Sequence, residues 1–172
     1  MREEIRGIPD HIRSTVVPPI FSAKYRGVNP DRMFFTDGSY INGSTGFGIF
    51  NQNVNASFKL KDPCSVYVAE LGAIYYALGI IETLPVDHYF IFSDSLSSIE
   101  AIRSMKLAKH SSYFLTKIRQ LLSALVEKLF TITLAWVPSH CSISGNEKAD
   151  SLAKVGALEG IILNGKLPIM NF

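Results

Sequence analysis

Four acidic side chains occupy positions where an ionised carboxylate needs a special reason. Asp37, Glu70, Asp94 and Asp150 lie at the end of an apolar strand pattern or on the packed stripe of a helix. Burying one charge is costly, and several converging like charges are less favourable still unless a cation lies between them. Carboxylate-rich sites prefer Mg²⁺ or Mn²⁺, so this pattern predicts a hard-metal site. Two such ions about 3.5–4 Å apart can activate a water and stabilise the leaving oxygen of a phosphodiester.

Each carboxylate also has a plainer interpretation. Asp37 could form a turn, Asp94 could cap a helix, and Asp150 could border solvent. Glu70 is harder to explain in this way, because its helical stripe is otherwise apolar and no Lys or Arg lies beside it there. Taken together, the four positions favour one metal site. No Cys/His zinc spacing, Walker loop or dinucleotide glycine fingerprint in the sequence competes with this interpretation.

Three strands are predicted in the first half of the chain. A short apolar run at 33–36 ends in Asp37, and Asn42-Gly43 is a strong hairpin signal before a second strand at 46–50. Apolar and polar residues then alternate at 56–60, which is typical of a half-buried strand. We therefore expect an antiparallel meander.

Helices and strands alternate in the second half of the chain. The patterns predict a helix at 66–84, a strand at 89–92, helices at 95–105 and 111–128, a strand at 130–136, and a helix from Ser144 to Gly160. Ser144 and Glu147 match a capping box at the start of the last helix. Its packed stripe is made mainly of small residues, which let a helix lie close to a sheet: Asn146, Ala149, Ala153 and Ala157.

This order of elements predicts an α/β fold with a mixed five-stranded sheet flanked by helices. The later strands follow helical crossovers, so they should run parallel to the first, which gives the order 3-2-1-4-5. The first and fourth strands are then neighbours, and Asp37 and Asp94 face each other at their carboxyl ends. Ligands of such sheets bind at this switch point.

Length and composition indicate one domain with an arm and a tail. The chain has 172 residues, 47% of them hydrophobic, and a net charge of +2. We expect residues 1–31, with four prolines, to be an irregular arm or a linker from a longer polypeptide, residues 32–160 to be the catalytic domain, and residues 161–172 to be a tail. Two cysteines make no disulfide framework, and there is no signal peptide or spanning segment. These features indicate an intracellular protein that does not use a membrane, with cytoplasm and nucleus not distinguishable.

A basic stretch without acids lies between Glu100 and Glu127. It is either a contact surface for phosphates or a solvated helix face. The cationic residues are Arg103, Lys106, Lys109, Lys117 and Arg119, with His110 among them.

The chain resembles the type 1 ribonuclease H family, especially the domains attached to reverse transcriptases of non-LTR retrotransposons. The likeness covers about residues 33–156. Its motifs are Thr36-Asp37-Gly38-Ser39, Ala69-Glu70-Leu71, Ser93-Asp94-Ser95, Trp136-Val137-Pro138-Ser139-His140, Gly145-Asn146-Glu147-Lys148-Ala149-Asp150 and Leu152-Ala153-Lys154.

The resemblance implies an endonuclease that cleaves the RNA strand of RNA/DNA hybrids and leaves 3′-hydroxyl and 5′-phosphate ends. It implies two Mg²⁺ ions, with Mn²⁺ able to substitute, held by the four carboxylates. His140 matches a loop histidine that assists proton movement or product release. Ser39, Asn42 and Ser95 match or adjoin positions that contact substrate. The implied partners are the hybrid and a covalently attached reverse transcriptase, while oligomeric state is not determined.

One departure from the family concerns substrate binding. Many members carry an extra basic helix that grips the hybrid, and the corresponding segment here, at 105–111, is short. We therefore expect weak hybrid binding by the isolated domain. Two other functions are compatible with the fold: a catalytically inert module that binds nucleic acid or braces a polymerase, and another nuclease or transposase. The four carboxylates disfavour the first, and the block from His140 to Asp150 disfavours the second.

Overall fold

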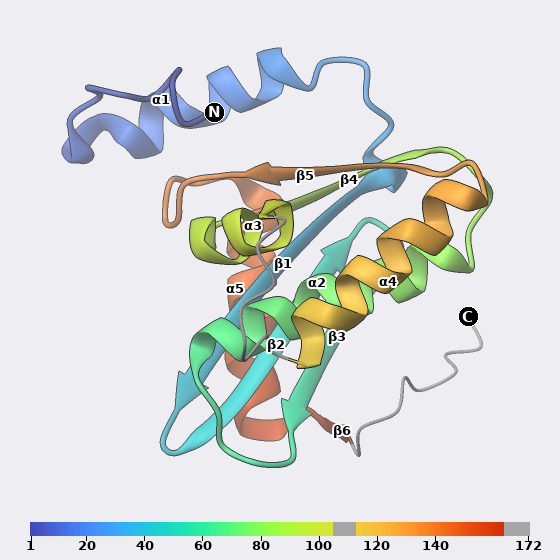
Figure 1. Ribbon diagram of the computed structural model, residues 1–172. Helices are drawn as coiled ribbons and strands as arrows, with labels where there is room; N and C mark the ends of the chain where they lie inside the picture. The colour runs from blue at the N-terminus through green and yellow to red at the C-terminus, as the bar shows by residue number, and fades with distance from the viewer. Residues whose placement is uncertain (105–112, 164–172) are drawn as a thin grey trace.

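A single mixed sheet with helices on both faces forms the centre of the protein (Figure 1). The computed structural model describes residues 1–104 and 113–163. The strands are β1 (Met33–Ile41), β2 (Ser44–Asn51), β3 (Val54–Leu60), β4 (His88–Ser93), β5 (Thr131–Trp136) and β6 (Ile161–Leu163). The helices are α1 (Asp10–Lys24), α2 (Val66–Glu82), α3 (Leu96–Arg103), α4 (Tyr113–Glu127) and α5 (Ser144–Glu159), with a short 3₁₀ turn η1 (Pro30–Arg32). No helix in these ranges is long and apolar enough to cross a membrane.

The predicted strand order is confirmed, but the predicted number of strands is wrong. The sheet runs β5-β4-β1-β2-β3-β6, which is the order 3-2-1-4-5 with a sixth strand at one edge. β1, β2 and β3 form the antiparallel meander, and β4 and β5 run parallel to β1. β6 pairs parallel with β3. At three residues it is too short to give a recognisable alternation in the sequence.

The sheet separates two apolar cores, because neighbouring strand residues point to opposite faces. Phe34 packs in the core with α2 and α4, whereas Phe35 packs in the core with α1 and α5. α2 supplies most of the first core and is buried along nearly its whole length. This arrangement fixes the position of α2 over β1, from which the site is built.

Residues 10–24 of the predicted irregular arm or linker (residues 1–31) form a helix, α1, so this part of the segment is regular. Proline is disfavoured inside a helix, yet α1 contains Pro18 and Pro19. The helix packs against the sheet: Val17 is fully buried, and the Phe21 ring lies 5.1 Å from that of Phe92 between centroids. Tyr25 also contacts Phe92, at 4.8 Å. Burial of these side chains therefore outweighs the local cost of the prolines.

α5 approaches β2 closely because two residues of β2 that face it, Gly46 and Gly48, are glycines without a Cβ atom. A Cβ atom on Gly46 would lie 2.1 Å from the Ala157 backbone nitrogen, and one on Gly48 would lie 2.4 Å from the Ala149 carbonyl oxygen. No residue other than glycine fits at such distances. The small stripe predicted for the last helix thus packs directly on the strand next to β1.

Candidate active site

Asp37 and Asp94 occupy equivalent places on two neighbouring parallel strands. The ladder between β1 and β4 ends at the pair Thr36 and Ser93, and each aspartate is the next residue along its chain. β1 continues beyond Asp37 to Ile41, because its antiparallel ladder with β2 extends that far. The predicted end of the first strand at residue 36 is therefore too early, but the predicted meeting of Asp37 and Asp94 is found.

Glu70 enters the same place from α2. Its side chain is 5% exposed and points to the sheet. A Cβ atom on Gly38 would lie 2.8 Å from the Glu70 backbone nitrogen, so this glycine lets α2 approach β1 closely. The Ser93 hydroxyl donates a hydrogen bond to Glu70 Oε2 at 3.5 Å. Carboxylate oxygens of Asp37, Glu70 and Asp94 all lie within 4.8 Å of one another; we call these three residues the buried triad.

The buried triad has no neutralising partner within the described residues, since none of its members forms an ion pair with Lys, Arg or His there. Burial raises the pKa of Asp37 to about 7, and the charges of Asp94 and Asp150 add to this effect. Burial raises the pKa of Glu70 still further, to about 10, with repulsion from Asp37 as the next cause. These shifts favour the protonated forms of Asp37 and Glu70 unless a cation takes the place of the protons.

Asn146 also belongs to the site. It lies within the sequence motifs, but no functional role was predicted for it. Its side-chain nitrogen donates a hydrogen bond to Asp94 Oδ2 at 3.4 Å, and Asn146 is 2% exposed. Burial raises the pKa of Asp94, while Asn146 and the nearby His140 oppose this rise. Its position four residues before Asp150, on the same helical stripe, was the available signal.

The side chain of Asp94 does not cap α3. The cap position is Ser95, and the Asp94 carbonyl accepts hydrogen bonds from the Leu96 backbone and from Trp136 Nε1, the latter at 2.9 Å. The carboxylate is thus left to face Asn146 and the rest of the triad. The alternative interpretation of Asp94 as a helix cap is therefore excluded.

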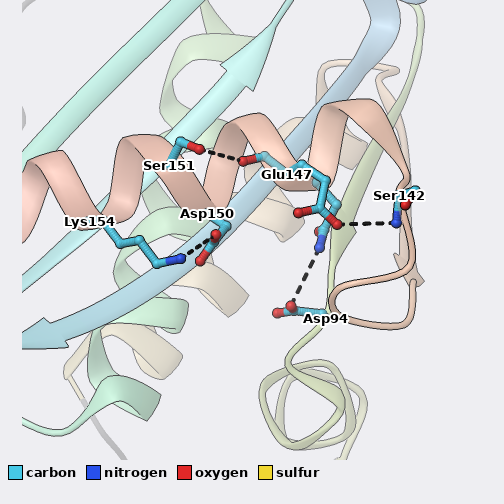
Figure 2. A network of polar contacts seen from close by, with 7 residues as sticks. Asp94, Ser142, Glu147, Asp150, Ser151 and Lys154 are labelled. Carbon is cyan, nitrogen blue, oxygen red and sulfur yellow. Dashed lines mark hydrogen bonds and ion pairs between the residues drawn. The ribbon is translucent and has the colours of Figure 1, made fainter. Parts of the chain in front are cut away.

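Asp150 belongs to a second group rather than to the buried triad. His140, Glu147 and Asp150 bring ligand atoms within 4.8 Å of one another; we call them the outer group. Asp150 lies along α5 with Lys154, whose Nζ is 2.6 Å from Asp150 Oδ2 (Figure 2). The outer group is half-buried to exposed, and His140 has a left-handed backbone with φ 51°.

The predicted capping box between Ser144 and Glu147 is not formed. α5 begins at Ser144 as expected, but its cap position is Ile143 and carries no side-chain cap hydrogen bond. Glu147 Oε1 instead accepts a hydrogen bond from the Ser142 backbone at 3.2 Å (Figure 2). This bond stabilises the loop that holds His140.

The two groups adjoin each other. The Asp150 charge contributes to the raised pKa of Asp37, and His140 lowers that of Asp94. All four predicted carboxylates and His140 therefore gather where the ladder between β1 and β4 ends, beside the first half of α5. Three of them share one compact set of atoms, and Asp150 with His140 lies beside it.

The predicted substrate contacts lie at different distances from this centre. Ser39 is two residues after Asp37 on β1, so both side chains leave the same face of the strand. Ser95 follows Asp94 and donates its hydroxyl to Ser98 at 2.8 Å. Asn42 lies at the exposed tip of the β1–β2 turn, with φ 50°, and belongs to neither group.

The donor set fits a hard cation. Three carboxylates without a cationic partner, two of them buried and that of Asp94 half-buried, supply the oxygen ligands that Mg²⁺ and Mn²⁺ prefer. Beside them, Asn146 Oδ1 is buried and has no hydrogen-bond partner in the described parts of the chain. Such an atom is suited to accept from an ordered water of an ion's hydration shell.

The basic stretch between Glu100 and Glu127 is only partly available to a ligand. Arg119 donates hydrogen bonds to the carbonyls of Ala101 and Ser104, which stabilises the end of α3. Lys117 lies over the Tyr113 ring. The other cationic residues predicted for this stretch, Lys106, Lys109 and His110, lie outside the described residues.

Comparison with known proteins identifies the family of the chain and a solved structure with a similar fold. The family model for RNase H matches residues 29–158. Among solved structures, RNase H1 from the halophilic archaeon Halobacterium salinarum NRC-1 is similar, with a TM-score of 0.53 and 17% sequence identity over 72% of this chain and 95% of that chain. None of the curated protein sequences compared with the chain matches it.

Proposed function

Because the chain belongs to the RNase H family, we propose that it hydrolyses the RNA strand of RNA/DNA hybrids at the buried triad. The observation that carries this proposal is the convergence of Asp37, Glu70 and Asp94 without a cationic side chain. A phosphodiester backbone is itself anionic, so a centre of this kind can accept it only with bound cations. The products would carry 3′-hydroxyl and 5′-phosphate ends.

The triad would hold one Mg²⁺, and Asp150 would share in holding a second beside Asp37. Mn²⁺ offers the same oxygen preference and would substitute. When bound, such ions activate the attacking water and neutralise charge at the leaving oxygen. Asn146 orients Asp94 for this role through its hydrogen bond of 3.4 Å.

His140 would assist proton movement or product release at the edge of the centre. It lies in the exposed loop between β5 and α5, held by the bond from Ser142 to Glu147. The resemblance to the family assigns this loop histidine to proton movement or product release. Ser39 and Ser95, which are close in sequence to Asp37 and Asp94, would contact a 2′-hydroxyl, the group that distinguishes RNA from DNA.

We place the reaction within reverse transcription of a retroelement, with a reverse transcriptase domain covalently attached. This rests on the motif phrase from Trp136 to Lys154. The mass of the native polypeptide tests it, because an attached polymerase requires a chain much longer than 172 residues. A native chain of this length alone would contradict the attachment.

The activity is tested with end-labelled RNA/DNA, RNA/RNA and DNA/DNA duplexes in Mg²⁺. We expect the wild type to cut only the RNA of the hybrid, and Asp94→Asn to lose this cutting. Asp62→Asn, which removes an exposed carboxylate outside both groups, should cut like the wild type. Wild-type protein that binds the hybrid without cutting it would favour the inert module instead. Undiminished cutting by Asp94→Asn would refute the assigned site.

A further inference from the structure

We propose that a basic hollow beside the candidate site binds backbone phosphates of the RNA/DNA hybrid. The hollow has a volume of about 610 Å³ and is formed by the N-terminal segment against the end of β5. This inference rests on the proposed function, because it names where part of the same substrate lies. The lining residues are Arg2, Glu3, Ile5, Arg6, Gly7, Arg13 and Trp136; we call this the arm hollow.

The arm hollow is part of the folded domain and not a loose extension. Ile5 is 4% exposed and packs in the same core as Val17, Val137 and Ile143. Arg13 Nε donates a hydrogen bond to the Ile8 carbonyl at 3.1 Å, which closes the segment onto α1. The cationic side chains are therefore presented from a fixed backbone.

The charged side chains of the hollow are predominantly positive, and not all of them are paired with an acidic residue. It contains three arginines and one glutamate. Arg13 pairs with Asp10 at 2.8 Å, and Arg2 is 68% exposed and lies 3.4 Å from Glu100. Arg6 forms no side-chain hydrogen bond or ion pair with any residue that the structure describes. Arg6 is thus the cation most available to an external anion.

One lining residue of the hollow, Trp136, contacts the backbone of Asp94, a member of the buried triad. Trp136 lines the hollow and also donates its Nε1 hydrogen to the Asp94 carbonyl at 2.9 Å. Arg13 also lies near Cys141, the residue after His140. Burial raises the pKa of the Cys141 thiol, and the charge of Arg13 opposes this rise. In Figure 1 the N-terminal segment lies over the same end of the sheet as the loop from β5 to α5.

A nucleic-acid duplex fits these features. Duplex DNA carries one negative charge per about 1.7 Å of helix axis, so a hybrid with one phosphate at the triad brings several others close by. Arginine forks bind phosphate in bidentate geometry, and backbone contacts of this kind fix the register of a duplex. The hollow would thereby supply part of the grip that a longer basic helix gives to other members of the family.

The test compares two arginines of the same N-terminal segment. Arg6→Ala removes a cation from the hollow, and Arg26→Ala removes one that is also exposed but does not line the hollow. Binding to a labelled RNA/DNA hybrid is measured by fluorescence anisotropy in EDTA, which prevents metal-dependent cutting, at several salt concentrations. We expect Arg6→Ala to weaken binding about three- to tenfold and to lower the salt slope by about one, with Arg26→Ala unchanged. Arg6→Lys should retain most of the affinity.

Equal affinity and equal salt slope for Arg6→Ala and Arg26→Ala would overturn the proposal. Thermal unfolding of both variants guards against a folding defect, and the reversal Arg6→Glu should weaken binding more than Arg6→Ala. Cutting by the wild type in Mg²⁺ is measured separately. If the wild type cuts the hybrid while both alanine variants bind it equally, the proposed phosphate binding by the arm hollow is refuted and the proposed function stands.

Discussion

The buried triad and the outer group differ in what their carboxylates need. Asp37, Glu70 and Asp94 are largely withdrawn from water and have no cationic partner in the described ranges, whereas Asp150 has Lys154 and Glu147 has the Ser142 backbone. The outer group is stable as it stands, because solvent and its own partners satisfy it. The buried triad is unfavourable unless protons or cations neutralise it. Only the triad therefore carries a strong argument for bound metal.

The largest effect is expected for Glu70→Gln. The substitution removes a ligand of the triad and should reduce cutting by at least about a hundredfold, beyond the loss typical of supporting residues. In EDTA at neutral pH the same variant should be no less stable than the wild type, because it removes a buried ionisable group. Cutting assays and thermal unfolding measure the two effects. A large loss of stability together with full activity would contradict the role of Glu70.

The pH dependence of stability tests the triad without any substitution. The pKa values of Asp37 and Glu70 are raised in the folded state, to about 7 and about 10. The folded protein thus binds more protons than the unfolded chain above the ordinary carboxyl pKa, so stability falls as pH rises through 5 to 8. Urea unfolding in EDTA should show this fall. Saturating Mg²⁺ should reduce it, since the ion binds the ionised carboxylates. Stability that rises over this range would contradict the assignment.

Asn146→Ala should produce an intermediate effect. Loss of its hydrogen bond leaves Asp94 less firmly oriented and removes a group that favours the charged carboxylate. We expect Mg²⁺ affinity to fall about ten- to a hundredfold, as for other residues that orient metal ligands. Isothermal titration measures the affinity. Unchanged affinity would mean that Asn146 serves packing alone.

The smallest effect is expected for Glu147→Gln. Glu147 is half-buried and its bond to Ser142 can be kept by an amide oxygen. Cutting should change less than about threefold, within the range of surface substitutions. A loss as large as that of Glu70→Gln, in the cutting assay, would erase the distinction between the two groups.

Much of this arrangement was predictable, because it depends on periodicity and strand order. Apolar runs ending in Asp37 and Asp94, joined by a helical crossover, suffice to place both where two neighbouring inner strands stop pairing. The apolar stripe around Glu70 predicts its direction in the same way. These are properties of the backbone and of the faces of the elements.

The parts that were not predictable depend on tertiary contacts. α1 forms in spite of Pro18 and Pro19 because the sheet offers Phe92 for packing. The separation of Asp150 from the triad and the bond from Glu147 to Ser142 depend on side-chain geometry at the start of α5. No local pattern encodes these distances.

The docking of α1 on the sheet has a practical consequence for how this domain is handled. The family match begins at residue 29, but the apolar surface made by Phe35, Phe90 and Phe92 is covered by residues that precede it. A chain shortened to the matched range would leave these aromatic rings open to water. Exposed patches of this kind promote aggregation, so solubility is set by residues that a family boundary would discard.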